Sequence, residues 1–258
     1  MSERPPSGLE RLWRHDALDR SPRLGLSLER VVQSGIKLAD RDGLAAVSMK
    51  RVAERLGFTT MSLYRHVASK DELLLYMHDT VWQPPPGLDA PLDGWRAGLE
   101  RWTWEQHLIM QRHPWLDEVR FIERAGTPSQ FAWMDMGLRA LTGTPLTEYQ
   151  KVAVLLLLSG HVSSQAQLAS TLVEGARQGL FGGPGQATEV FGELLRTVVS
   201  AERFPALHVA VVGGAFAPMQ DPTYAPFEFG LELMLDGIDE LMKRPASKHE
   251  SRTLIADR

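Results

Sequence analysis

The segment from Ser48 to Leu74 constrains the fold of this chain more than any other, because it holds three helix signals in a short length. Ser48 can cap one helix, and Gly57 can close it in the left-handed conformation that other residues avoid. Thr59 can cap a second helix, and the apolar Leu63 can anchor that helix in a core. Two short helices joined by so sharp a turn predict a helical corner.

The spacing of Ala53, Gly57 and Leu63 is typical of a helix-turn-helix. The small alanine lets the two helices cross closely, the glycine turns the chain, and the leucine locks the second helix against the first. A third helix is expected from Ser69, because Ser69 and Glu72 have the spacing of a capping box. This pattern is short, so an ordinary three-helix corner with solvated polar residues is the alternative.

Helical periodicity dominates the whole chain, and strand signals are nearly absent. Apolar and small residues recur on one helical face from Leu28 to Ala39, and Asp42-Gly43 ends that helix. Further helices are expected over residues 95–112, 128–141, 147–174, 187–202 and 225–243. We therefore predict an all-α protein with an N-terminal three-helix domain and a larger helical domain.

Composition excludes several classes of site. The chain has 258 residues and no cysteine, which rules out disulfides, thiolate metal sites and thiol redox sensing. The N-terminus lacks the apolar region of a secretory signal, and no uninterrupted apolar run approaches membrane-spanning length. We expect a soluble, cytoplasmic protein with no membrane partner, cofactor or bound metal. Whether a metal accompanies a ligand is left open.

The proline run at 84–86 divides the chain into parts of opposite charge. Residues 1–83 carry a net charge of +2 and residues 84–258 a net charge of −6. An anionic partner for the first part fits this asymmetry, although the charge alone is weak evidence. The predicted organisation is a flexible arm over 1–23, a helix-turn-helix domain over 24–83, a ligand-binding and dimerisation domain over 84–244, and a polar tail over 245–258.

The arm is open to two interpretations. Its arginines could reach into a minor groove, or the segment could be a solvated tail, which we favour because acids and prolines are interspersed with the arginines. The arginines in question are Arg4, Arg11, Arg14, Arg20 and Arg23.

The outward positions of the second helix carry groups suited to nucleic acid. Short hydroxyls and a thioether can approach base edges, an arginine can pair with guanine, and ring groups can reach phosphates. These positions are Thr60, Met61, Ser62, Tyr64, Arg65 and His66. Lys50 and Arg51 add positive charge beside the first helix, and Lys70 does so at the start of the third, where free N–H groups attract phosphate.

The sequence MKRVAERLGFTTMSLYRHVASKDELL resembles the DNA-binding signature of the TetR family of bacterial transcription regulators, and the likeness begins at LSLERVVQSGIKLADRDGLAAVS. The resemblance implies that Tyr64, His66 and Lys70 hold phosphates, and that the start of the recognition helix faces bases. Many members have a small residue or proline where this chain has Met61, which puts the operator sequence in doubt. The predicted DNA-binding set is Lys50, Arg51, Thr59, Thr60, Met61, Ser62, Tyr64, Arg65, His66 and Lys70.

The stretches RHPWL and FEFGLELMLDGIDEL resemble the tetracycline-repressor type of C-terminal domain, which senses small molecules and dimerises. An effector pocket needs apolar walls and a few polar groups. Aromatic, methionine and polar residues at helical spacing suggest Trp104, His107, Met110, Phe131, Met134, His161 and Gln165 as its lining. Plain core packing is the alternative for each of them.

The resemblance also implies a homodimer that binds a palindromic operator and usually represses transcription until the effector binds. The helices near 147–174 and 225–243 are the expected dimer contacts, unless Val152, Leu155 and Leu156 only fill the core of one subunit. Two recognition helices in a dimer would meet major grooves about 34 Å apart. Nonspecific architectural DNA binding and an enzyme are the alternatives; no compact catalytic or metal-binding motif favours the enzyme.

Overall fold

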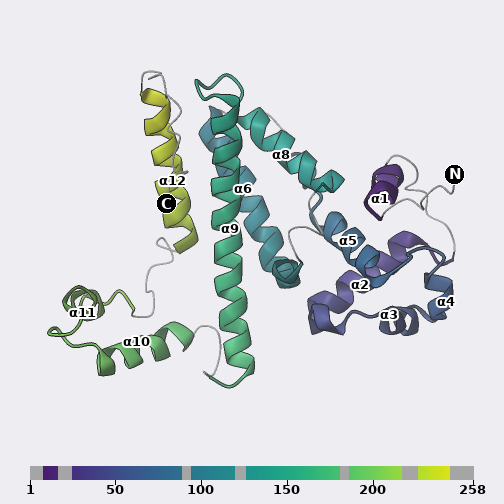
Figure 1. Ribbon diagram of the computed structural model, residues 1–258, viewed down its shortest axis with the longest axis horizontal. Coiled ribbons are helices and arrows are strands. Elements are labelled where there is room, and N and C mark those ends of the chain that lie inside the picture. The colour runs from purple at the N-terminus through teal and green to yellow at the C-terminus, as the bar shows by residue number, and fades with distance from the viewer. Residues whose placement is uncertain are drawn as a thin grey trace, which may run out of the picture.

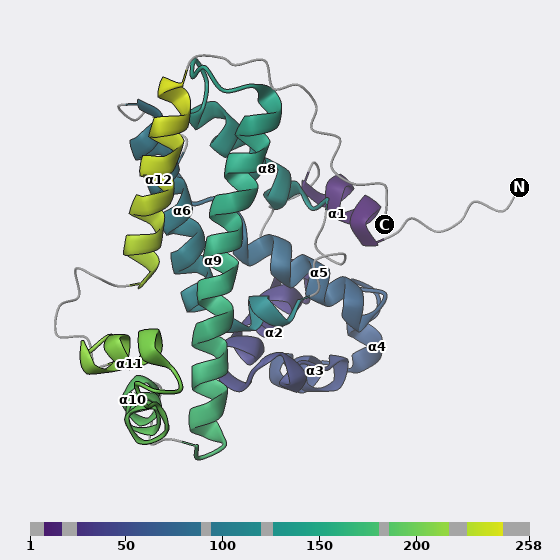
Figure 2. The same ribbon diagram turned by 60° about the vertical axis from the view of Figure 1, so that its left-hand side comes forward.

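The computed structural model describes residues 8–16, 25–88, 94–119, 126–180, 186–216 and 226–244, and every regular element in these ranges is a helix (Figure 1). The predicted all-α class is confirmed for this part of the chain. A small group of short helices, α2 to α5, forms what we call the head. The longer helices from α6 onward form what we call the body (Figure 2).

Each α-helix of the head begins at a serine or threonine cap, and α2 and α3 end at glycines with positive φ. The elements of the head are α2 (Leu28–Asp42), η1 (Leu44–Ala46), α3 (Met49–Leu56), α4 (Thr60–Leu63) and α5 (Lys70–Val81). The predicted caps are confirmed: Ser48, Thr59 and Ser69 each accept a bond from the backbone N–H three residues on. Gly57 ends α3 in the left-handed region, with φ 75°.

The body is built around the long helix α9. Its elements are α6 (Gly94–Arg112), η2 (Pro114–Glu118), α8 (Pro128–Ala140), α9 (Glu148–Arg177), α10 (Ala187–Val198), α11 (Pro205–Val212) and α12 (Pro226–Lys243). α9 packs against α6, α8 and α12 (Figures 1 and 2). Gly137 lets α8 approach α9 closely, because a Cβ there would lie 2.6 Å from Leu155 Cδ2.

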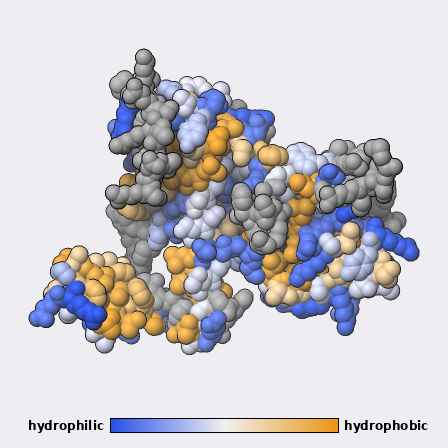
Figure 3. Space-filling view, viewed as in Figure 1, coloured by the Kyte–Doolittle hydropathy of each residue, from blue (hydrophilic) through white to orange (hydrophobic). Residues whose placement is uncertain are grey.

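One hydrophobic core runs through the head and most of the body. It includes Val31 and Met77 in the head, Leu99 and Leu158 in the body, and Leu231 on α12. The α10 and α11 helices have a separate small core of Leu195, Val199 and Val211. They project from the lower end of α9 as a lobe with a largely apolar surface (Figure 3). Head and main body are therefore coupled by packing, and the α10–α11 lobe is not part of that core.

Residues Glu148–Val173 of α9 are long and apolar enough, by length and composition, to cross a membrane. The same test is passed by mostly buried core helices of soluble proteins, whereas 22% of this window is buried. One side of α9 packs against three other helices of the body. The helix predicted over 147–174 is confirmed, and Ser159, Gly160 and His161 interrupt its longest apolar run without ending the helix.

The N-terminal segment differs from the flexible arm expected over 1–23. Residues Gly8–Asp16 form a helix, α1, which packs against α5 and α8. Leu12 is buried in the main core, and this burial explains why so short a helix is stable. Residues 1–7 and 17–24 lie outside the described residues, as does the predicted polar tail.

The helix expected over 187–202 ends at Val198, and α11 was not predicted.

Candidate functional site

The helix-turn-helix consists of α3 and α4, joined by the turn at Gly57. Phe58 N donates to Ala53 O at 3.0 Å, which closes α3 and directs the chain into α4. Val52, Ala53 and Leu63 are buried between the helices, and Leu63 has no exposed surface. The geometry predicted from the spacing of Ala53, Gly57 and Leu63 is present.

The outer side of α4 carries the exposed residues of the candidate DNA interface. Met61 is 72% exposed and Tyr64 is 47% exposed, unusual values for large apolar and aromatic side chains. Arg65 and Lys70 are also exposed, whereas His66 and Thr60 are half-buried. Thr59 Oγ1 and Ser62 Oγ lie 3.0 Å apart and share a hydrogen bond, so part of their bonding capacity is used within the turn.

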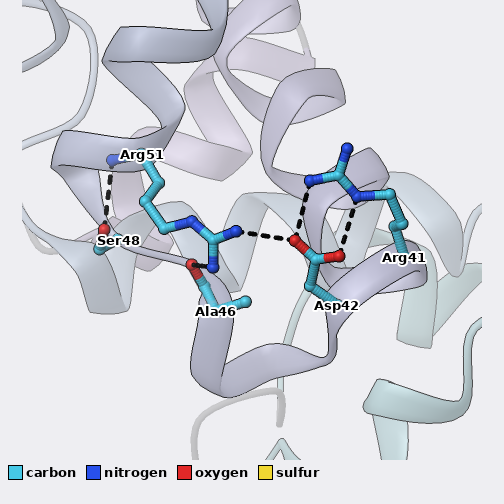
Figure 4. Close-up of polar contacts among 5 residues, drawn as sticks. All are labelled: Arg41, Asp42, Ala46, Ser48 and Arg51. Atoms are coloured by element: carbon cyan, nitrogen blue, oxygen red, sulfur yellow. Dashed lines mark hydrogen bonds and ion pairs between the residues drawn. The ribbon is translucent and has the colours of Figure 1, made fainter.

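Arg51 is held by the head itself (Figure 4). Its guanidinium donates to Asp42 Oδ2 at 2.8 Å and to the Ala46 carbonyl at 3.3 Å. Asp42 also accepts two bonds from Arg41, and these arginines lower the pKa of Asp42 to about 2. Arg51 therefore ties the start of α3 to the end of α2. The Lys50 side chain is 80% exposed and lies 3.9 Å from Glu54.

A cavity of about 250 Å³ lies within the body, between α6, α8 and α9. Three tryptophans, Trp82, Trp102 and Trp133, form part of its wall. Trp102 Nε1 donates to the Trp133 carbonyl at 2.8 Å, and Trp133 Nε1 donates to the Trp82 carbonyl at 2.6 Å. Because these bonds engage the N–H groups of Trp102 and Trp133, both rings are held as fixed apolar walls.

The cavity also has a few polar groups, as a small-molecule site requires. Gln106 Oε1 accepts a bond from Ser159 Oγ at 3.3 Å, and its amide donates to the Trp102 carbonyl. Gln130 Oε1 is buried and has no hydrogen-bond partner among the described residues. A buried acceptor without a partner costs free energy, so Gln130 Oε1 is suited to a donor on a ligand.

Two of the seven residues predicted for the pocket, Met110 and Met134, line this cavity. Gln165 does not, and Phe131 instead contacts Trp13 of α1. Trp104, His107 and His161 surround Phe227 at the start of α12. The rings of His107 and His161 stack on Phe227 at centroid distances of 3.7 and 5.1 Å. Burial and the neighbouring His161 lower the pKa of His107.

Sequence reasoning missed most of the cavity wall, including Trp82, Trp102, Gln106, Gln130, Trp133 and Ser159. A signal for part of it was present, because Trp102, Gln106 and Met110 recur every four residues and therefore share one face of α6. Trp104 and His107 face elsewhere on the same helix. Which of these two faces meets α8 and α9 depends on tertiary packing.

Polar contacts connect the helices around the cavity with the head. Asp79 of α5 accepts a bond from Ser129 N at the start of α8, at 2.9 Å. Trp133, a wall of the cavity, donates to the carbonyl that follows the last residue of α5. Trp115 Nε1 of η2 and Nδ1 of His113, the residue before η2, each lie 2.7 Å from Asp40 Oδ1 of α2. Movement of α6 or α8 would therefore be transmitted to α2 and α5.

Comparison with known proteins gives two family matches. Residues 31–77 match the family described as bacterial regulatory proteins, tetR family, and residues 86–242 match the tetracyclin repressor-like C-terminal domain. The chain is 34% identical over 242 residues to the HTH-type transcriptional repressor DrrR1 of Streptomyces coeruleorubidus, covering 91% of this chain and 85% of that protein. It is 26% identical over 139 residues to the class E tetracycline repressor protein of Escherichia coli, covering 52% of this chain and 64% of that protein.

Solved structures with the same fold include ActR of Streptomyces coelicolor. The complex of ActR with (S)-DNPA has a TM-score of 0.63 and 25% identity, covering 85% of this chain and 100% of ActR. The complex with actinorhodin has a TM-score of 0.67 and 24% identity, covering 86% of this chain and 99% of ActR. The sequence matches and the fold therefore agree over both head and body.

Proposed function

The chain belongs to the TetR family of bacterial transcription regulators, and we propose that it represses transcription from a palindromic operator until a small aromatic molecule enters the body cavity. The observation that carries this proposal is an exposed recognition surface on α4 that hydrogen bonds and core packing connect to the cavity. The relatives are regulators, which favours a regulator over an enzyme.

In the proposed complex, α4 enters the major groove. Tyr64, His66 and Lys70 hold phosphates, and Thr60, Met61 and Ser62 face base edges. The exposure of Met61 and Tyr64 supports these roles. Lys50, in an exposed pair with Glu54, and the exposed Arg65 can reach the DNA, whereas Arg51 acts on binding by positioning α3 against α2. Thr59 retains its role as the cap of α4.

We propose a flat, hydroxylated aromatic effector. Fixed indole walls favour a planar ring system, and the buried oxygen of Gln130 calls for an O–H or N–H donor. The likeness to ActR, solved in complex with (S)-DNPA, supports a ligand-responsive body. Typical small-molecule pockets measure about 300 to 1,000 Å³. A cavity of about 250 Å³ would therefore have to widen for a larger ligand, by moving α8 away from α9.

The proposed dimer interface is formed by α9 and α12. Leu156, Leu157 and Leu168 of α9 are exposed although they lie in the middle of an apolar helix, and Phe229 and Leu233 of α12 are exposed as well. Exposed apolar side chains on two helices that pack together favour association with a second copy. Val152, Leu155 and Leu156 line the cavity, so the core alternative fits these three residues, although Leu156 is also 63% exposed. It does not fit Leu157 or Leu168, which are exposed and do not line this cavity.

A titration of the protein against its own promoter DNA and against scrambled DNA of equal length tests the proposal. We expect tighter binding to the promoter by a factor of about 10³ or more. Tyr64→Ala should weaken binding to both, because it removes a phosphate contact. Arg139→Ala, which removes an exposed cation on α8 that pairs with Asp135, is the matched control and should bind like the wild type. Equal affinity for both DNAs with a steep salt dependence would favour architectural binding.

A further inference from the structure

The helix α1 precedes the matched DNA-binding region and contacts both the head and the body. We propose that α1 is a tie that couples the cavity to the recognition helix, with Trp13 and Arg11 as its two positioning residues. The inference rests on the proposed function, because it concerns how a change at the cavity reaches the DNA-binding surface. Figures 1 and 2 show α1 beside α5 and the end of α8 nearest the head.

Trp13 fixes α1 to the body. Its Nε1 donates to the carbonyl of Gly126 at 3.0 Å, and its ring lies 5.7 Å from that of Phe131 on α8. The residue before Phe131 is Gln130, which lines the cavity together with Met134. A ligand that displaces α8 would therefore move Phe131, and would act on Gly126, which lies two residues before α8.

Arg11 fixes α1 to the head through Glu72. Its Nε donates to Glu72 Oε1 at 2.6 Å, and the Glu72 side chain is only 4% exposed. The same oxygen accepts a bond from Tyr76 OH at 2.9 Å. A buried carboxylate is costly without a paired cation, so the position of Arg11 determines how well Glu72 is held.

Glu72 in turn holds the turn that follows the recognition helix. Its Oε2 accepts a bond from Ala68 N at 2.5 Å, two residues beyond His66. The capping box predicted for Ser69 and Glu72 is therefore only half formed. Ser69 caps Glu72 N, but the Glu72 carboxylate bonds the N–H of Ala68. Trp13, Arg11, Glu72 and Ala68 thus form a continuous chain of contacts from α8 to the recognition helix.

The length of α1 makes this tie releasable. It has nine residues, and an isolated helix shorter than about 12 to 15 residues is marginal in water. Its helical state depends on contacts such as the burial of Leu12 in the main core. Loss of the contacts of Trp13 or of Arg11 should therefore weaken the whole helix. The two sets of contacts are expected to act as one unit.

A double-mutant cycle on the full-length protein tests the tie without a ligand. Gly137→Ala imitates a displaced α8, because its Cβ would lie 2.6 Å from Leu155 Cδ2 and 3.0 Å from Trp102 Cε2. Amide hydrogen exchange of the segment 66–72 reports how well Ala68 is held. We expect Gly137→Ala to accelerate exchange there by roughly fivefold or more, the lower end of ordinary allosteric coupling. In a Trp13→Ala background, Gly137→Ala should change exchange less than about twofold, because the tie is already broken.

Two further variants separate positioning from simple loss of structure. Trp13→Phe keeps the ring contact with Phe131 but loses the bond to Gly126, and should give an intermediate coupling. Tyr149→Ala, at an 84% exposed aromatic on α9, is the control and should leave the Gly137→Ala effect unchanged. Thermal unfolding establishes that each variant is folded at the temperature of measurement.

An equal effect of Gly137→Ala with and without Trp13, or no effect in either background, would overturn the tie. Operator binding by the same variants is a separate readout. If the wild type does not prefer its promoter but the exchange cycle shows coupling, the proposed function fails and the tie stands. If promoter binding is specific but the exchange effects are additive, the proposed function stands and the tie fails.

Discussion

Gly57→Ala tests whether the turn between α3 and α4 depends on backbone conformation alone. Gly57 has φ 75° and ψ 28°, and a Cβ added there would meet no heavy atom within 4 Å. The substitution therefore creates no clash. An alanine in the left-handed region costs about 1 to 2 kcal/mol, and the stiffer unfolded chain offsets about 0.4 to 1 kcal/mol of this. The expected net destabilisation is about 1 kcal/mol.

Thermal unfolding followed by circular dichroism measures this change. A loss of about 1 kcal/mol should lower the midpoint by about 2 to 4 °C in a protein of this size. Gly57→Asn is the matched control, because asparagine enters the left-handed region more readily, and it should lower the midpoint less. A midpoint for Gly57→Ala at or above that of the wild type would refute the reasoning. Equal losses for Ala and Asn would show that the cost has another source.

Three further predictions concern the DNA interface, the dimer and pH. Lys70→Ala should weaken binding to all DNAs and reduce the salt slope by about one, whereas Met61→Ala should change which operator variants are preferred in a competition assay. Leu157→Glu should convert the dimer to a monomer in light scattering and abolish tight operator binding, since it places a charge in the proposed interface. Burial, with His161, lowers the pKa of His107, so the unfolded chain binds its proton first as pH falls. The contribution of neutral His107 to stability should be fully present above about pH 6.5 and be lost as pH falls through the lowered folded-state pKa. His107→Phe should therefore reduce the fall in the unfolding midpoint across this pH range.

The head could be predicted from sequence because its determinants are local. Ser48, Thr59 and Ser69 each act on an N–H group three residues away, and Gly57 is identified by the conformation that its turn requires. The bond that Ala68 N donates to the Glu72 carboxylate departs from the predicted capping box. Its cause is not local, because Arg11, 61 residues away, holds the other oxygen of the carboxylate.

The cavity and α1 could not be predicted, because both depend on contacts between distant segments. Periodicity identifies α6 as a helix but leaves open which of its faces meets α8 and α9. Trp102 and Trp104 are two residues apart, yet one lines the cavity and the other contacts Phe227. In α1, arginines surround Leu12 and Trp13, and the partner of Trp13 is 113 residues away.

Trp133 gives the clearest physical reason for a link between ligand and DNA in this fold. Its ring is a wall of the cavity, and its Nε1 donates to the carbonyl of Trp82, which follows α5 directly. An occupant that rotates this ring must stretch or break a part-buried hydrogen bond. A fully buried acceptor left unpaired costs about 1 to 3 kcal/mol, which is an upper bound here. A shift of α5 can restore that bond, and α5 begins beside the turn of the recognition helix. The state with a displaced α5 is then the one that the ligand favours, and a ligand changes DNA affinity only through such a difference between states.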